Sequence, residues 1–230
     1  MEAKVMTPFQ TRVLENLFVA GVGQNGYCFT GGTALAEFYL QHRHSEDLDV
    51  FTRAPRSIKN DYLDVKRHLE HEGFEVRAES EQDEFVRFFV RDPEQSAEEL
   101  KVEFARYAGA QMSPALTVGR VVVDSFEDIA VNKVCAIYGR FEVKDFVDLF
   151  FILKESKFAL DHLVGRAKEK EGAFDWEDAV LEFATKLLGV KDMQLHQIRM
   201  IKPLSLDDLR SYLVPKAEEI IRRLRPSGAR

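Results

Sequence analysis

Two aspartates stand one residue apart in the segment HSEDLDVF, at Asp47 and Asp49. If this segment is a strand, both carboxylates point to one face while Leu48 and Val50 point to the other, because side chains alternate along a strand. Paired carboxylates on one face can share Mg²⁺ or Mn²⁺, which take oxygen ligands and keep positions for water and phosphate. A charged strand edge or turn has the same pattern, so the pair by itself defines only a candidate metal site.

Two glycines precede the acidic pair, at Gly31 and Gly32 in the segment FTGGTALAEFYL. Helix-forming residues follow Thr33, which predicts that the glycines lie at the turn from a short strand into a helix. Glycine leaves backbone N–H groups uncovered, and a helix N-terminus attracts phosphate. A phosphate-binding turn followed by a carboxylate pair suits an NTP with its metal ions, whereas a tight turn without a ligand is the simpler alternative.

A third acid lies further along the chain, at Glu103 in the segment LKVEFARY. If Val102 and Phe104 face the core of a strand, Glu103 faces the opposite side, where the acidic pair is expected. Glu103 is therefore a candidate third metal ligand, and the alternative is an ordinary glutamate on a solvent-facing surface.

The second half of the chain contains charged residues at helical spacing. Lys133 and Arg140 are seven residues apart and share a helix face, where they are placed to meet triphosphate oxygens. Asp145 and Asp148 share a face of an otherwise apolar helix, and an acid in such a helix is either paired or functional. The structural alternative is that these aspartates pair with Lys133 or Arg140 and fasten the two halves of the chain together.

The elements that position these residues predict an α+β protein. Residues 1–124 mix helices with strands, and residues 125–230 are helical, with no flexible tether between them, so we expect the helical domain to pack on the first. In the first domain we expect helices over Thr7–Gly21 and Ser57–His71, strands near GYCFT, DLDVFT, FEVRAES, EFVRFFVRD, LKVEFARY and RVVVDS, and a helix after Thr33. In the second we expect helices over SFEDIAVNKVCAIYGRF, VKDFVDLFFILKES, Phe158–Glu171, Trp176–Leu188 and Leu206–Arg225, the last bent at Pro215.

Composition narrows the classes of function. The 230 residues carry a net charge of -7, which argues against a globally basic nucleic-acid-binding protein but leaves a local basic patch open. Hydrophobic residues make up 45%, enough for a sizeable core, and no signal peptide or membrane-length apolar run stands out. We therefore expect a cytoplasmic protein. Cys28 and Cys135 are expected to be buried free thiols, and His42 and His44 a solvated helix end rather than zinc ligands.

Four segments in a fixed order carry a family resemblance: GGTALA, HRHSEDLDVF, LKVEF and NKVCAIYGRFEVKDFVDLFFI. Together they resemble the AbiEii/AbiGii toxin family, a branch of the DNA polymerase β-like nucleotidyltransferase superfamily. The resemblance extends from about residue 29 to residue 152. Glycines followed by D-x-D are shared across the superfamily. The third acidic position is often Asp, and this chain departs from that pattern with Glu103.

The resemblance implies a nucleotidyltransferase-like mixed sheet with flanking helices, followed by a C-terminal helical bundle. It also implies the toxin of a toxin–antitoxin system, with a cognate antitoxin, that moves an NMP from an NTP such as ATP to an acceptor hydroxyl. That acceptor is RNA such as a tRNA end, or a protein side chain, and the cofactor is Mg²⁺ or Mn²⁺. The implied metal ligands are Asp47, Asp49 and Glu103, the other catalytic residues Lys133, Asp145 and Asp148, and the nucleotide-binding residues Gly31, Gly32, Thr33, Arg43, Ser45, Lys133 and Arg140.

Two alternatives stay open. One is a nucleotidyltransferase that modifies an antibiotic or another small molecule. The other is a non-catalytic binding module of the same fold. The complete set of acids argues against the second alternative, because clustered carboxylates without metals would leave their repulsion uncompensated.

Overall fold

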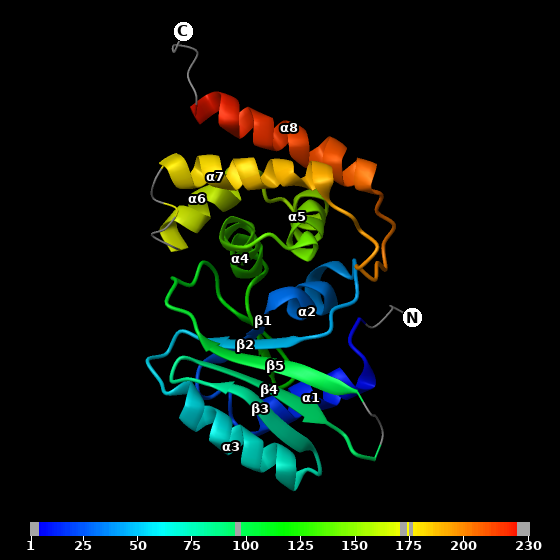
Figure 1. Cartoon of the computed structure of the whole chain (residues 1–230). Helices are drawn as coiled ribbons and strands as arrows, with labels where there is room; N and C mark the ends of the chain where they lie inside the picture. Colours follow the sequence, from blue (N-terminus) through cyan, green and yellow to red (C-terminus); the bar gives the residue numbers. More distant parts are fainter. Residues whose placement is uncertain (1–4, 95–97, 171–173, 175–176, 225–230) are drawn as a thin grey trace. The chain divides into compact units, whose positions relative to one another are not determined.

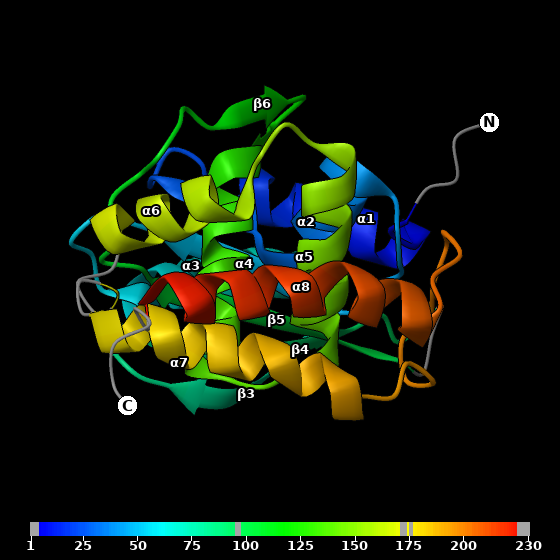
Figure 2. The same ribbon diagram turned by 90° about the horizontal axis from the view of Figure 1, so that it is seen from above.

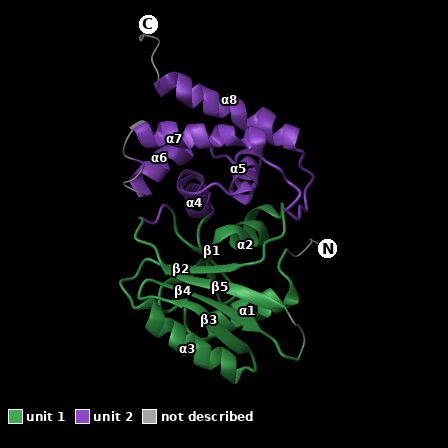
Figure 3. Cartoon of the chain, in the orientation of Figure 1, with its two compact units in different colours: residues 1–109, 113–125 green, residues 110–112, 126–230 purple. Residues whose placement is uncertain are grey.

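The computed structural model describes residues 5–94, 98–170, 174 and 177–224. They form two compact units, drawn in green and purple in Figure 3. Unit 1 comprises residues 1–109 and 113–125, and unit 2 comprises residues 110–112 and 126–230. The chain thus enters unit 2 briefly, returns to unit 1, and leaves it again after residue 125.

Unit 1 is built on a seven-stranded sheet with the order β3-β4-β5-β2-β1-β7-β6. The pairs β2–β5 and β1–β7 are parallel, and the other neighbours are antiparallel. This mixed sheet and the helices around it confirm the predicted α+β fold class. The strands are β1 (Tyr27–Thr30), β2 (Leu48–Thr52), β3 (Glu75–Glu81), β4 (Phe85–Arg91), β5 (Glu99–Arg106), β6 (Leu116–Val118) and β7 (Val121–Val123).

Two long helices cover one face of this sheet, α1 (Pro8–Val19) and α3 (Ile58–His71) (Figure 1). Thr7 caps α1, with its hydroxyl accepting from the backbone N–H of Gln10, and Ser57 caps α3 in the same way. Against α3 lie the apolar sides of the central strands, and the core there is made of fully buried side chains: Leu48, Val50, Tyr62, Phe88, Val102 and Phe104.

The helix after the glycines lies against the other face of the sheet. It begins as α2 (Gly31–Leu35), continues as a π-helical segment (Ala36–Leu40), and ends at Gln41, which has a positive φ of 50°. The sequence predicted the helix but gave no sign of the wider π-helical turns. The short strand β6 was also missed, although its partner β7 was predicted.

Unit 2 is helical, as predicted. Its helices are α4 (Phe126–Gly139), α5 (Val143–Glu155), α6 (Leu160–Lys170), α7 (Glu177–Leu188) and α8 (Leu206–Leu224), with a 3₁₀ turn at Gly189–Asp192. Figures 1 and 2 show α7 and α8 side by side. Pro215 lies inside α8, which continues through it. The predicted helix ends at Trp176 and Arg225 lie outside the described residues.

The segment 110–112 is held in unit 2 by a buried acid. The Asp128 carboxylate accepts from the backbone N–H of Met112 at 3.0 and 3.2 Å and from Lys170 Nζ at 2.8 Å. Arg166 in turn donates to the Met112 carbonyl oxygen at 3.0 Å. The side chains of Asp128 and Lys170 are 0% exposed, so this ion pair is entirely within the core of the unit.

Two smaller expectations need correction. His42 is 0% exposed, so it is not part of a solvated helix end, whereas His44 is half-buried. Both cysteines are thiols rather than disulfide partners, as predicted, but only Cys135 is buried and Cys28 is half-buried. Among the described residues, no helix has both the length and the apolar character needed to cross a membrane.

Candidate functional site

The acidic pair lies at the start of the central strand β2. Asp49 is in β2 and Asp47 is the residue just before it, and both are half-buried. Leu48 and Val50 are 0% exposed, so the two aspartates take the other, more open face of the sheet. The local fold follows from the alternation of apolar and acidic residues, since only one register buries both Leu48 and Val50.

Glu103 lies on the neighbouring strand, directly opposite Asp49 in the parallel β2–β5 register. Val102 and Phe104 are 0% exposed, and the Glu103 side chain is 16% exposed on the opposite face. The predicted orientation of Glu103 is therefore confirmed. Opposed residues of adjacent strands have neighbouring side chains, so Glu103 and Asp49 face the same surroundings.

The two glycines are packed against the acidic strand. Gly31 has a positive φ of 75°, and a Cβ atom on it would overlap the Asp49 carboxylate. A Cβ atom on Gly32 would overlap the guanidinium of Arg43 and lie 3.2 Å from Ser45 Oγ. The absence of side chains at both positions is therefore what lets the turn, the acid and the Arg43 side chain come together.

Thr33 and Arg43 make contacts that hold this arrangement. The Thr33 hydroxyl donates to the backbone carbonyl of Asp47, which ties the helix to the start of β2. Arg43 is only 3% exposed and donates to the backbone carbonyl of His44 at 3.0 Å. Gln10 supports the same loop by donating to the Ser45 carbonyl at 2.9 Å. In the structure, Thr33 thus positions the acidic strand, a role that the sequence did not indicate.

The turn is also supported by Asp124, the residue just after β7, for which the sequence predicted no role. Asp124 is 3% exposed, and its carboxylate accepts from the hydroxyl of Thr30, the residue before Gly31, at 3.2 Å. The Tyr39 hydroxyl donates to the Asp124 carbonyl at 2.8 Å. These bonds attach both ends of the helix after the glycines to the end of β7.

Two basic residues next to the acids were missed. Lys101 Nζ lies 2.8 Å from Asp47 Oδ2 and 3.5 Å from Glu103 Oε1, and Arg87 Nε donates to Glu103 Oε1 at 2.8 Å. Burial alone would lower the pKa of Lys101, but the hydrogen bond to Asp47 and the charges of Asp47, Glu103 and Asp49 outweigh it and raise that pKa. Lys101 is two residues before Glu103, so period-two alternation was the signal that would have found it.

The acids have the oxygen donors that a divalent cation prefers, but they are not arranged around a common metal position. In the described part of the chain, no three Asp, Glu, His or Cys side chains are placed together to hold a metal ion. At this site the Lys101 ammonium contacts both Asp47 and Glu103 and supplies positive charge there. Asp47 and Asp49 on one face provide the oxygen donors that Mg²⁺ and Mn²⁺ prefer, so these two residues fit a metal.

The four charged residues predicted in the helical half form one ion cluster within unit 2. Lys133 Nζ lies 2.9 Å from Asp145 Oδ1 and 2.7 Å from Asp148 Oδ2, and Arg140 Nε lies 2.9 Å from Asp145 Oδ2. Both aspartates are 0% exposed and Lys133 is 6% exposed. Burial would raise the pKa of Asp145, but the charge of Lys133 and the hydrogen bond from Arg140 outweigh it and lower that pKa.

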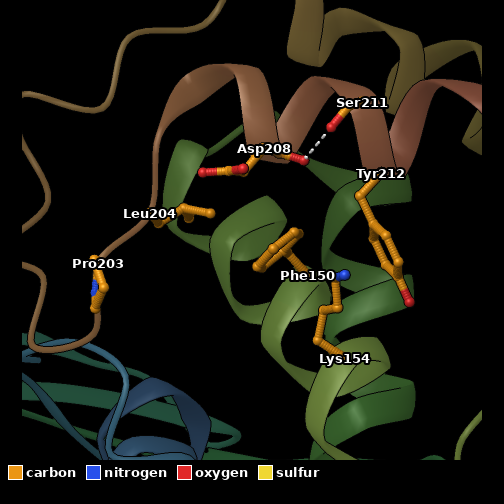
Figure 4. Close-up of a pocket in the computed structure, with 7 residues that line it drawn as sticks. All are labelled: Phe150, Lys154, Pro203, Leu204, Asp208, Ser211 and Tyr212. Atoms are coloured by element: carbon orange, nitrogen blue, oxygen red, sulfur yellow. Dashed lines mark hydrogen bonds between the residues drawn. The ribbon is translucent and has the colours of Figure 1, made fainter.

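Unit 2 also has a pocket of about 190 Å³ between α5, α8 and the segment before α8 (Figure 4). Phe150 and Tyr212 meet there edge to face at 5.3 Å, and the Lys154 ammonium lies 4.6 Å from the centre of the Tyr212 ring. Asp208 lines the pocket but binds Ser205 at the start of α8. None of the residues singled out in the sequence lines this pocket, and its acid serves as a helix cap.

The mixed sheet, the glycine turn and the acidic strand that faces it define a protein of the nucleotidyltransferase class. Residues 12–221 match the family model described as nucleotidyl transferase AbiEii toxin of type IV toxin–antitoxin systems. The chain belongs to this AbiEii nucleotidyltransferase toxin family. The family implies an NTP substrate and a cognate antitoxin.

Solved structures share the fold. JHP933 from Helicobacter pylori is 22% identical with a TM-score of 0.61, and the match covers 96% of this chain and 95% of that one. MenT4, a nucleotidyltransferase toxin from Mycobacterium tuberculosis, is 17% identical with a TM-score of 0.58, covering 91% and 82%. A comparison with curated proteins gives no match. At these identities the structures support the fold alone.

Proposed function

We propose that this toxin transfers an NMP from a Mg²⁺- or Mn²⁺-bound NTP to a hydroxyl of RNA, such as a tRNA end, in the cytoplasm. The observation that carries the proposal is the packing of the Gly31–Gly32 turn against Asp49, because it brings a backbone turn without side chains next to an acid of the D-x-D pair. RNA as the acceptor follows from the family resemblance of the motifs.

In this proposal the glycine turn and the acids bind different parts of the nucleotide. The backbone N–H groups of Gly31 and Gly32 bind the β- and γ-phosphates, and Arg43 and Ser45 beside Gly32 support that end of the turn. Asp47 and Asp49 hold the metal. When bound, the metal neutralises phosphate charge and orients the α-phosphate for in-line attack.

Glu103 is proposed to receive the acceptor's proton. The acceptor oxygen forms a bond to the α-phosphorus, the bond from that phosphorus to the bridging oxygen of pyrophosphate breaks, and pyrophosphate leaves. The hydroxyl proton passes to Glu103, and its position opposite Asp49 on the neighbouring strand supports this role. Arg87 and Lys101 hold the Glu103 carboxylate in place.

For the helical cluster we propose two roles that can be separated by experiment. Lys133 and Arg140 were expected to meet triphosphate oxygens, with Asp145 and Asp148 as catalytic partners. The pairing of Lys133 with two fully buried aspartates instead favours a scaffold that joins α4 to α5. The measurements that distinguish these roles are set out in the Discussion.

The decisive experiment is to incubate the protein with each labelled NTP and total RNA and then determine the mass of the RNA ends. We expect an added nucleotide with Mg²⁺ or Mn²⁺, none with EDTA, and none with Asp49→Asn. A small polyol or aminosugar should be offered in parallel. Transfer to that small molecule without transfer to RNA would contradict the proposal and support an antibiotic-modifying enzyme.

Growth provides an independent test of the toxin activity. Expression should slow bacterial growth, and Asp47→Ala should relieve the arrest, because Asp47 is one of the two proposed metal ligands. Calorimetry should show tighter NTP binding with Mg²⁺ than with EDTA. Equal growth arrest by wild type and Asp47→Ala would favour the non-catalytic binding module.

A further inference from the structure

Lys101 pairs directly with one of the proposed metal ligands of unit 1. Its ammonium lies 2.8 Å from Asp47 Oδ2 and 3.5 Å from Glu103 Oε1, and Asp49 adds to the negative charge around it. The side chain is 30% exposed, so it is held among the acids but keeps a path to water. The Lys101 ammonium thus offsets part of the negative charge that these three carboxylates create together.

The position of this ammonium conflicts with a metal bound to Asp47. A carboxylate oxygen that accepts a hydrogen bond from Lys101 Nζ cannot bind a divalent ion in the same direction, and two cations a few ångströms apart repel each other. Arg87 contrasts with Lys101 here. Arg87 pairs with Glu103 and with Glu79 on β3. Among the contacts of the described residues it does not pair with Asp47, and Lys101 does.

We propose that Lys101 is a positioning residue that substitutes for the metal in the ligand-free protein and is displaced when the metal binds. The inference rests on the proposed function, since it needs Asp47 and Asp49 to be the metal ligands. The exchange keeps a positive charge beside the three carboxylates in both states. It also lowers the affinity of the free protein for a divalent ion, because the ion must compete with an internal cation.

The displaced ammonium would find a new binding partner in the nucleotide. Lys101 has a flexible side chain at the open face of the sheet, and a triphosphate bound at the glycine turn would bring new negative charge to that face. Metal binding without nucleotide should therefore be weak in the wild type. Removing the ammonium should strengthen it even when no nucleotide is present.

The test is Mn²⁺ binding to the whole chain without nucleotide, measured by calorimetry. Lys101→Met and Lys101→Gln should each bind Mn²⁺ roughly tenfold more tightly than wild type, the order expected for loss of a close, partly exposed charge. The Mn²⁺ affinity of Lys101→Arg should stay within roughly twofold of that of wild type, because this variant keeps the positive charge. Lys59→Met is the matched control, since it removes an exposed lysine paired with Glu81 elsewhere in the same unit.

The outcomes separate this inference from the proposed function. If wild type and both neutral variants bind Mn²⁺ equally, Lys101 does not compete with the metal and the inference is wrong, while metal-dependent transfer can still stand. If Lys59→Met tightens binding as much as Lys101→Met, net charge explains the effect and the inference is also wrong. Absence of Mn²⁺ binding in wild type and all variants would overturn both. Asp47→Asn in the Lys101→Met background should remove the gain.

Discussion

Units 1 and 2 each gather acids around a lysine, but they expose these charges to water very differently. In unit 1 the side chains of Asp47, Glu103 and Lys101 are 28%, 16% and 30% exposed. In unit 2 Asp145 and Asp148 are 0% exposed, and Lys133 between them is 6% exposed. The distances are nearly the same, since the shortest Lys–Asp separations are 2.8 Å in unit 1 and 2.7 Å in unit 2.

This difference separates charges that can change partners from charges that cannot. A half-exposed carboxylate can release an ammonium and take a metal ion at low cost, because water solvates the intermediate arrangement. A fully buried pair has no such exchange, since removing one partner leaves an uncompensated charge in the core. We therefore expect the chemistry at the acids of unit 1, and we expect the cluster in unit 2 to fix one arrangement of α4 and α5.

The largest expected effect is on the stability of unit 2. Lys133→Met should lower the free energy of unfolding by about 3–5 kcal/mol, because it leaves two buried carboxylates without their shared cation. Thermal and urea unfolding of the whole chain measure the loss. If Lys133 faces a triphosphate instead, the apo protein should unfold like wild type and single-turnover transfer should fall.

A double variant sharpens this result. Adding Asp148→Asn to Lys133→Met removes one of the uncompensated charges, so it should recover part of the lost stability. Failure of the double variant to recover any stability would mean that the packing of the Lys133 side chain, and not its charge, supports the helices.

The next effect is on chemistry in unit 1. Asp49→Asn keeps the size of the side chain but removes a proposed metal ligand, so transfer should slow at least about a hundredfold. The melting temperature should change little, because Asp49 is half-buried and accessible to water. Glu79→Gln is the control, as Glu79 lies on the same sheet and pairs only with Arg87 among the contacts described. Equal slowing of transfer in both variants would show that Asp49 has no special role.

The two ion clusters should also lose their stabilising effect at opposite ends of the pH scale. The pKa of Asp145 is lowered in the folded state. Its contribution to the free energy of unfolding is therefore complete at pH values well above the ordinary pKa of 3.8, and it is lost as pH falls through the folded pKa. The pKa of Lys101 is raised, so its contribution is complete well below 10.5 and is lost as pH rises through the folded pKa.

Urea unfolding between pH 3 and pH 11 would measure these two losses. The stability difference between wild type and Asp145→Asn should shrink in acid, and that between wild type and Lys101→Met should shrink in alkali. Parallel pH curves for wild type and Asp145→Asn would show that the ion cluster in unit 2 does not stabilise the fold.

The smallest effect is expected for a pair on the surface of the same sheet. Arg91 and Glu75 are paired across β3 and β4 with side chains 42% and 55% exposed. Arg91→Met should change the free energy of unfolding by less than about 1 kcal/mol and leave transfer unchanged. A larger loss of stability would mean that exposure is a poor guide to the strength of these ion pairs.

Much of this site was predictable because its signals are local in sequence. Gly31, Gly32, Asp47 and Asp49 lie within one strand–helix–strand segment, and alternation along single strands gave the directions of Asp49 and Glu103. Alternation also gives the direction of Lys101, but its pairing with Asp47 and the pairing of Arg87 with Glu103 depend on the registers of β5 with β2 and β4. Those registers join segments far apart in the chain, and no local pattern specifies them.

Burial was the other quantity that the sequence predicted poorly. The spacing of Lys133, Arg140, Asp145 and Asp148 indicated helix faces but could not indicate which face would lie in the core. The same is true of His42, whose burial follows from the tertiary packing of the loop before β2. The π-helical turns at Ala36–Leu40 also depend on packing, since their residues have ordinary helical preferences.

The bonds between Met112 and Asp128 limit how this protein can be cut into pieces. A fragment that starts at Phe126 would contain all five described helices of unit 2 but would lack Met112. The Asp128 carboxylate would then lose its backbone donor and keep Lys170, deep in the core. A fragment starting at Ala110 keeps that donor. A fragment for solution studies of the helical unit should therefore begin at or before residue 110, even though the first helix of the unit begins sixteen residues later, at Phe126.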